Sequence, residues 1–133
     1  MIIDLHNKDI DIKQLTKQAI IDPNLIKELL NNLNSKEEIV RFNSYQVIKE
    51  FSLSHPDKLY PYWHEFENKL YIDNAYQMLI GIIILANLCV VDKNNKFERI
   101  FDKYCNLLND RRITVSLYIL SNLGRIAKVK PNL

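Results

Sequence analysis

The side chains that could carry acid–base or metal chemistry are scattered along the chain. The three histidines are His6, His55 and His64. Only His64 precedes closely spaced glutamates, Glu65 and Glu67, and no second histidine follows at the spacing of a zinc-binding HExxH helix. The two glutamates point to different faces of a helix, so they cannot act as a pair. We predict no metal site and no catalytic acid–base pair.

The two cysteines also lack the setting of a nucleophile. Cys89 and Cys105 both lie in apolar helical patterns, and burial raises the pKa of a thiol and makes it inert. We expect two reduced thiols in an intracellular protein, and one disulfide between them is the alternative. Ser44 and Ser116 are interpreted as packing residues. The expectation is therefore a protein that is not an enzyme and has no catalytic residue.

Glycine is scarce, and this excludes several ligand-binding motifs. Gly81 and Gly124 are the only glycines, where average usage near 7% would give roughly nine. The chain has no glycine-rich phosphate-binding loop and no G-x-S-x-G nucleophile turn. We therefore predict no cofactor and no cofactor-binding residue.

The C-terminal third of the chain is basic, although the net charge of the whole chain is only +2. Basic side chains there could contact phosphates or an acidic partner. The cations proposed for such contacts are Arg111, Arg112, Lys128 and Lys130. Interleaved acidic residues favour the alternative, a solvated charged rim. The low net charge disfavours nucleic acid as the main partner.

Apolar residues recur at helical spacing along most of the chain, so we predict an all-α protein. Asp22-Pro23 is a typical helix start, with a capping side chain before proline at the first helical position. Short connections imply that successive helices are antiparallel neighbours. The helices are expected over residues 11–21, 23–34, 36–54, 56–71, 73–91, 96–109 and 111–127.

The most apolar stretch, residues 78–91, is too short to cross a membrane. Its 14 residues would form a helix about 21 Å long, whereas a bilayer core of ~30 Å needs about 20 residues. We interpret it as a helix buried in a soluble domain. Asp4, Asp9 and Asp11 interrupt the N-terminus, so no signal peptide is expected there, and the predicted location is the cytoplasm, with no membrane partner.

Small residues recur at Ser44, Gly81 and Ser116, with spacings of 37 and 35 residues. A small residue lets the second helix of a pair cross closely over the first. Each is followed by apolar residues at +3, +4 and +7, which would fill the groove to the next pair. These residues are Val47, Ile48 and Phe51, then Ile84, Leu85 and Leu88, then Ile119, Leu120 and Leu123.

The segment 38–44, with Val40-Arg41 three residues before Ser44, resembles the opening of the second helix in HEAT and armadillo-type repeats. The segment 122–127 resembles the end of such a helix. The resemblance covers roughly residues 22–130, and the middle repeat departs from it because Gln77-Met78 replaces Val40-Arg41. It implies a right-handed α-solenoid of about three antiparallel helix pairs with a short N-terminal helix.

On this basis we expect one HEAT/armadillo-like domain over residues 1–133. Its parts are an N-terminal capping segment (1–21), three repeats (22–54, 55–91 and 92–130), and a tail or the start of a further repeat (131–133). A solenoid needs capped ends, so we expect either a fragment of a longer solenoid or a frayed tail.

In such a solenoid the second helices present one row each to a partner. The rows contain the following residues proposed for partner binding: Gln46, Lys49, Leu79, Ile83, Ala86, Tyr118, Ser121 and Arg125. The middle row is apolar, which indicates either burial by neighbouring helices or a contact patch for a partner protein or a second copy bound through residues 78–91. The expected function is therefore a protein-binding scaffold, and nucleic-acid contact through the basic C-terminal third is the alternative.

Overall fold

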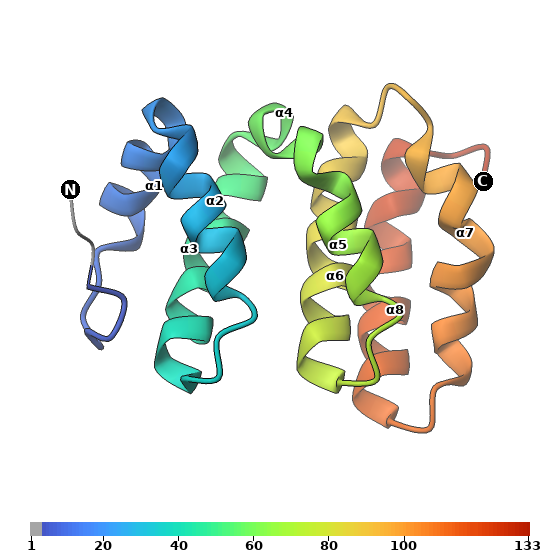
Figure 1. The fold of residues 1–133 in the computed structure, drawn as a ribbon. Helices are drawn as coiled ribbons and strands as arrows, with labels where there is room; N and C mark the ends of the chain where they lie inside the picture. The colour runs from blue at the N-terminus through green and yellow to red at the C-terminus, as the bar shows by residue number, and fades with distance from the viewer. Residues whose placement is uncertain (1–3) are drawn as a thin grey trace. The chain divides into compact units, whose positions relative to one another are not determined.

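The structure is a computed structural model that describes residues 4–133. All regular elements of these residues are helical, which confirms the all-α prediction (Figure 1). The predicted helix ends differ from the observed ones by two residues at most when 3-10 turns are included. The elements are α1 (Ile12–Ile21), α2 (Pro23–Asn32), α3 (Glu38–Ser54), α4 (Pro56–Leu59), η1 (Tyr60–Tyr62), α5 (Trp63–Lys69), α6 (Ala75–Leu88), η2 (Cys89–Val91), α7 (Lys96–Asn106), η3 (Leu107–Asn109) and α8 (Ile113–Val129).

Polar side chains cap the starts of three helices. Asp11 accepts a hydrogen bond from the amide of Gln14 at the start of α1, and Asp22 does the same for Asn24 ahead of Pro23. Asn74 caps α6 through the amide of Gln77. Each side chain pairs one amide that the first turn of a helix leaves unpaired, so these residues fix where the helices begin.

The helix expected over 56–71 is interrupted near its N-terminal end. Residues Tyr60–Tyr62 form the 3-10 turn η1 between α4 and α5. Pro61 causes the interruption because it has no amide hydrogen and its ring collides with the preceding turn.

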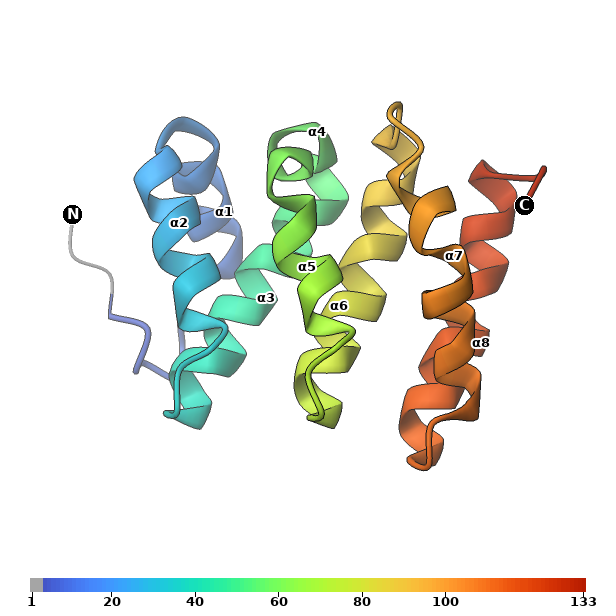
Figure 2. The ribbon, with the colours of Figure 1, turned by 45° about the vertical axis from the view of Figure 1, so that its right-hand side comes forward.

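The contacts divide the chain into two compact units, one ending at His55 and one beginning at Pro56. In the first unit, α2 and α3 form an antiparallel hairpin and α1 packs against both (Figures 1 and 2). Leu29, Val47 and Phe51 are almost fully buried there. The apolar faces of the three helices thus form the core of this unit.

The second unit contains two antiparallel hairpins, α5–α6 and α7–α8 (Figure 2). Helix α6 packs against α5 on one side and α8 on the other. The core of this unit includes Trp63, Phe66 and Phe97. The buried Tyr104 donates a hydrogen bond to the carbonyl of Ile82 in α6. The apolar helix predicted at 78–91 is therefore the central helix of this unit.

The predicted close helix crossing is confirmed at Gly81. A methyl group at this position would lie 2.8 Å from the carbonyl oxygen of Phe66 in α5. Ser44 is fully buried in α3, and its hydroxyl donates to the carbonyl of Val40. A small side chain is thus required at Gly81 because the backbone of α5 occupies the adjacent space.

The third repeat differs from the predicted register. Val115, Ile119 and Ile126 are the buried stripe of α8, whereas Leu120 is exposed and Leu123 is half-buried. The +4 and +7 positions after Ser116 therefore do not fill a groove within the described chain. Val115 begins the packed stripe one residue earlier than the repeat pattern suggested.

In the part of the chain that the structure describes, no helix combines the length and the apolar character that crossing a bilayer requires.

Candidate interaction surface on helices α6 and α8

Helices α6 and α8 of the second unit lie side by side and carry two of the predicted contact rows. On α8, Tyr118 is 40% exposed, and Ser121 is exposed as well. On α6, Leu79 and Ile83 are half-buried. Ala86 is buried, which differs from its expected exposure, so it offers no contact area.

Arg125 connects the two helices through hydrogen bonds. Its guanidinium donates to the Asn87 side-chain oxygen in α6 at 2.8 Å and to the Asn122 side-chain oxygen in α8 at 2.5 Å. Asn122 in turn donates to the carbonyl of Tyr118. Each amide group is thereby fixed, and the surface around Tyr118 is held in one arrangement.

The first unit carries the corresponding row on α3. Lys49 is exposed and Gln46 is half-buried. Phe42 and Leu53, at the two ends of the row, are exposed large hydrophobic residues. This row therefore combines apolar ends with a polar centre.

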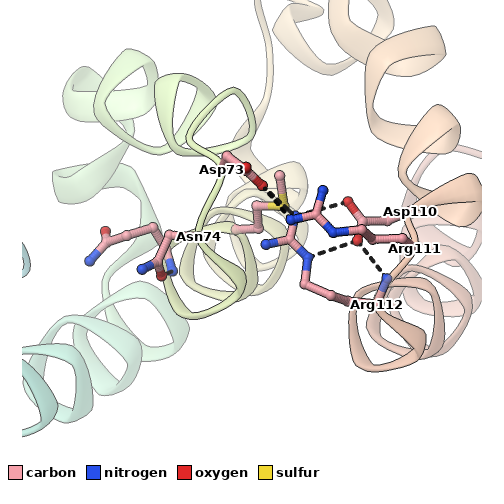
Figure 3. Close-up of polar contacts among 7 residues, drawn as sticks. Asp73, Asn74, Asp110, Arg111 and Arg112 are labelled. Carbon is pink, nitrogen blue, oxygen red and sulfur yellow. Dashed lines mark hydrogen bonds and ion pairs between the residues drawn. The ribbon is translucent and has the colours of Figure 1, made fainter.

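Four charged residues form a cluster at the start of α6 and α8 (Figure 3). Arg112 contacts Asp110 through Nε at 2.9 Å and through Nη2 at 3.1 Å. It also lies 3.1 Å from Asp73, which precedes α6, and Arg111 lies 3.4 Å from the same carboxylate. Both arginines that were predicted to contact phosphates are thus paired with carboxylates of the same unit.

The hydrogen bonds from Arg112 lower the pKa of Asp110 to about 2. Because this pKa is below its ordinary value of roughly 3.9, the contribution to stability is complete above pH 4 and is lost as the pH falls toward 2. We therefore expect Asp110→Asn to flatten the dependence of the urea midpoint on pH between 4 and 2. The control is Asp102→Asn, a change at an exposed aspartate of α7. An unchanged slope in Asp110→Asn would contradict the assignment.

A second polar cluster lies where η2 leads into α7. Asp92 is buried, and its carboxylate accepts hydrogen bonds from the Tyr60 hydroxyl at 2.5 Å and from the amides of Lys96 and Phe97 at 2.9 and 2.8 Å. Lys130 completes the shell at 3.2 Å. One carboxylate thus caps α7 and joins three segments of the chain.

Lys130 is almost enclosed by this cluster. Its side chain is 9% exposed, and its ammonium group also lies 2.7 Å from Glu98. The Tyr60 hydroxyl in the same cluster is buried and donates a hydrogen bond to Asp92. Both effects raise the pKa of Tyr60 to about 12. Burial of Asp92 opposes its ionisation, but the bonds that it accepts hold its pKa below the ordinary value. Lys130 therefore faces protein carboxylates, whereas Lys128 is exposed.

A groove of about 700 Å³ borders the second cluster, and Val90 and Lys93 line it together with the C-terminal residues 131–133. Asp92 and Lys130 also line this groove, and they already form an ion pair with each other. The groove is consequently a feature of the packing between η2 and the tail.

Neither cysteine has the setting of a nucleophile. Both are free thiols, with Cys89 buried and Cys105 half-buried. Burial raises the pKa of Cys89 to about 12 and also raises that of Cys105. Among residues 4–133, no group of three His, Cys, Asp or Glu side chains is placed to hold a metal ion.

Sequence reasoning missed the polar residues that organise this surface. Asn87 was a signal, because it is a lone amide inside the otherwise apolar run 78–91. A buried amide needs a partner, and the partner is Arg125, which lies 38 residues later. Asp92 gave no comparable signal, since an aspartate after an apolar run is typical of a turn.

No known family, no curated protein and no solved structure matches this chain significantly.

Proposed function

We propose that this protein is an intracellular interaction module of HEAT/armadillo-like helical-repeat type that holds another protein on the surface of its second helices. The observation that carries the proposal is the packing of α6 against α8, with Tyr118 exposed on α8 and Leu79 and Ile83 half-buried on α6. The antiparallel hairpins and the period near 36 residues support the repeat architecture. The cytoplasmic location is part of the same proposal.

The mechanism would be binding to a preformed surface. The Arg125 bridge holds α8 against α6 before any partner arrives. Binding of a partner would then cost little side-chain entropy in this protein, because its side chains are already ordered. An apolar anchor within a polar rim is typical of interaction sites. Tyr118, Leu79 and Ile83 would be the anchor, and Ser121 would lie in the rim. Gln46 and Lys49 on α3 are proposed as further contacts.

Capture of partners from a cell extract tests this proposal. Tyr118→Asp places a charge at an exposed anchor position, and we expect a loss of at least tenfold in the partner captured, because apolar contact area is replaced by a group that needs water. Ile83→Asp should give the same loss if its fold is retained, as circular dichroism would show. Glu65→Lys, on the exposed side of α5, is the control. Equal capture by wild type and Tyr118→Asp would overturn the proposal.

Nucleic acid is a weaker candidate because the carboxylates of Asp73, Asp110 and Asp92 engage Arg111, Arg112 and Lys130. Filter binding with DNA and RNA at low salt should therefore show no retention. Retention that Lys128→Glu abolishes would replace the protein-binding proposal with a nucleic-acid one.

Self-association through residues 78–91 would need accessible area on α6. Most of that helix is buried within the protein, and Val90 is the one exposed large hydrophobic residue in the segment. Light scattering on the purified chain should give the mass of a monomer.

A further inference from the structure

Helix α8 has an apolar face that is separate from its predicted contact row, which consists of Tyr118, Ser121 and Arg125. Ile113, Leu117 and Leu120 are 72%, 55% and 59% exposed. Their spacings of four and three residues place them on one side of the helix, with Gly124 four residues further along. We call Ile113, Leu117, Leu120 and Gly124 the outer face of α8. A methyl group built on Gly124 would meet no atom within 4 Å, so this face is open.

Helix α6 carries a comparable apolar stripe at the same spacings, and that stripe is covered. Met78, Ile82 and Leu85 are 7%, 0% and 0% exposed, and Cys89, which follows in η2, is 5% exposed. Helix α8 packs against α6. The outer face of α8 thus has the composition of a helix-packing face.

The element that packs on α6 indicates what a covering element looks like. The buried side of α8 is a stripe of aliphatic side chains, Val115, Ile119 and Ile126, at spacings of four and seven residues. An amphipathic helix with a similar aliphatic stripe would bury the outer face of α8 in the same way.

Charge defines the occupant further. Residues 111–133 contain five cations and no aspartate or glutamate. Three of the cations, Arg111, Arg112 and Lys130, pair with carboxylates elsewhere in the unit. The other two, Arg125 and Lys128, are exposed along α8. A second copy of α8 would bring these cations against one another, whereas acidic residues beside the aliphatic stripe would complement them.

We propose that the outer face of α8 is a docking site for an amphipathic helix of another protein whose aliphatic stripe is flanked by acidic residues. The aliphatic stripe would cover Leu117 and Leu120, and the acidic flank would lie along Arg125 and Lys128. Gly124 would let the incoming helix approach closely, as Gly81 does for α5.

Two stapled helical peptides with one leucine stripe test the proposal, one with glutamate flanks and one with lysine flanks. Fluorescence anisotropy should show the glutamate-flanked peptide binding at least tenfold tighter at low salt. Leu120→Asp should weaken its binding at least tenfold. Lys128→Glu should weaken it several-fold and should remove much of its salt dependence.

Equal binding of the two peptides, or binding that Leu120→Asp leaves unchanged, would overturn the proposal, and so would an absence of binding. A dimer of the free chain that Leu120→Asp converts to a monomer would also overturn it, because the occupant would then be a second copy. The two side chains to be changed, Leu120 and Lys128, are both exposed, so unfolding is not expected.

This inference does not depend on the proposed function, because Leu120 and Tyr118 lie on different faces of α8. Tyr118→Asp should leave peptide binding within twofold of wild type. Loss of peptide binding in Tyr118→Asp as strong as in Leu120→Asp would show that the two faces are one site and would contradict the assignment to the outer face.

Discussion

Asp92→Ala is expected to lower the free energy of unfolding by about 3–5 kcal/mol, the usual cost of removing one partner from a buried ion pair. The change would leave the ammonium group of Lys130 enclosed with Glu98 as its remaining carboxylate partner. It would also unpair the Tyr60 hydroxyl and the amides of Lys96 and Phe97. This loss is a large part of the total stability of an ordinary domain.

Urea unfolding followed by circular dichroism measures this loss. The matched control is Asp57→Ala, because Asp57 is an exposed aspartate that lines the same groove, and its change should cost less than about 0.5 kcal/mol. In Asp92→Ala/Lys130→Met the enclosed ammonium group is absent, so the double variant should be more stable than the sum of the two single losses predicts. Additive losses, or a loss in Asp92→Ala as small as that in Asp57→Ala, would contradict the role given to the ion pair.

The pKa of Asp92 lies below its ordinary value, which sets the sign of the pH effect. The stability that this carboxylate contributes is complete above roughly pH 4 and is lost as the pH falls through its lowered pKa. The stability difference between wild type and Asp92→Ala should therefore shrink in acid.

Gly81→Ala is expected to destabilise the protein by about 1–3 kcal/mol, because the added methyl group would lie 2.8 Å from the backbone oxygen of Phe66. Leu70 and Lys69 lie on the same side at 3.2 Å, so α5 would have to move as a whole. The higher helix propensity of alanine, about 1 kcal/mol, offsets only part of this cost.

Gly124→Ala is the matched control and should have the opposite sign. Gly124 is also inside a helix, but the space beside it is open. The propensity gain is then unopposed, and we expect this variant to be more stable by up to about 1 kcal/mol. Thermal unfolding of the two variants in parallel gives the answer. Equal shifts in the same direction would contradict the close contact between α5 and α6.

The sequence was sufficient to predict the helices because their start signals are local. Asp22-Pro23 fixes the beginning of α2, and the spacing of Ser44 and Gly81 indicated the positions where a small residue is buried. The predicted register of α8 was wrong because two adjacent stripes of that helix are apolar. Hydrophobicity alone does not say whether Ile119 or Leu120 meets the neighbouring helix, since this depends on which helices are present to cover each stripe.

The polar contacts of the candidate site were harder to predict. Arg125 was expected at the surface, but the sequence does not show that it meets Asn87, which lies 38 residues away. Lys130 was expected to face a partner and instead faces Asp92 and Glu98. Such pairings depend on how separate hairpins stack, and this information is spread over the whole second unit.

The packing of α6 against α8 brings together two of the helices that carry the proposed contact residues. Tyr118 and Ser121 lie on α8, Leu79 and Ile83 lie on α6, and Arg125 holds the two helices together.

The most direct test of the account is site-specific photo-crosslinking in cells, with benzoylphenylalanine placed at position 118 or, as a control, at position 65. We predict that the variant with the crosslinker in place of Tyr118 forms a discrete covalent adduct with another protein, and that the variant with the crosslinker in place of Glu65 does not. Adducts of the same pattern and yield from both positions, or no adduct from position 118, would contradict a protein-binding surface on α6 and α8.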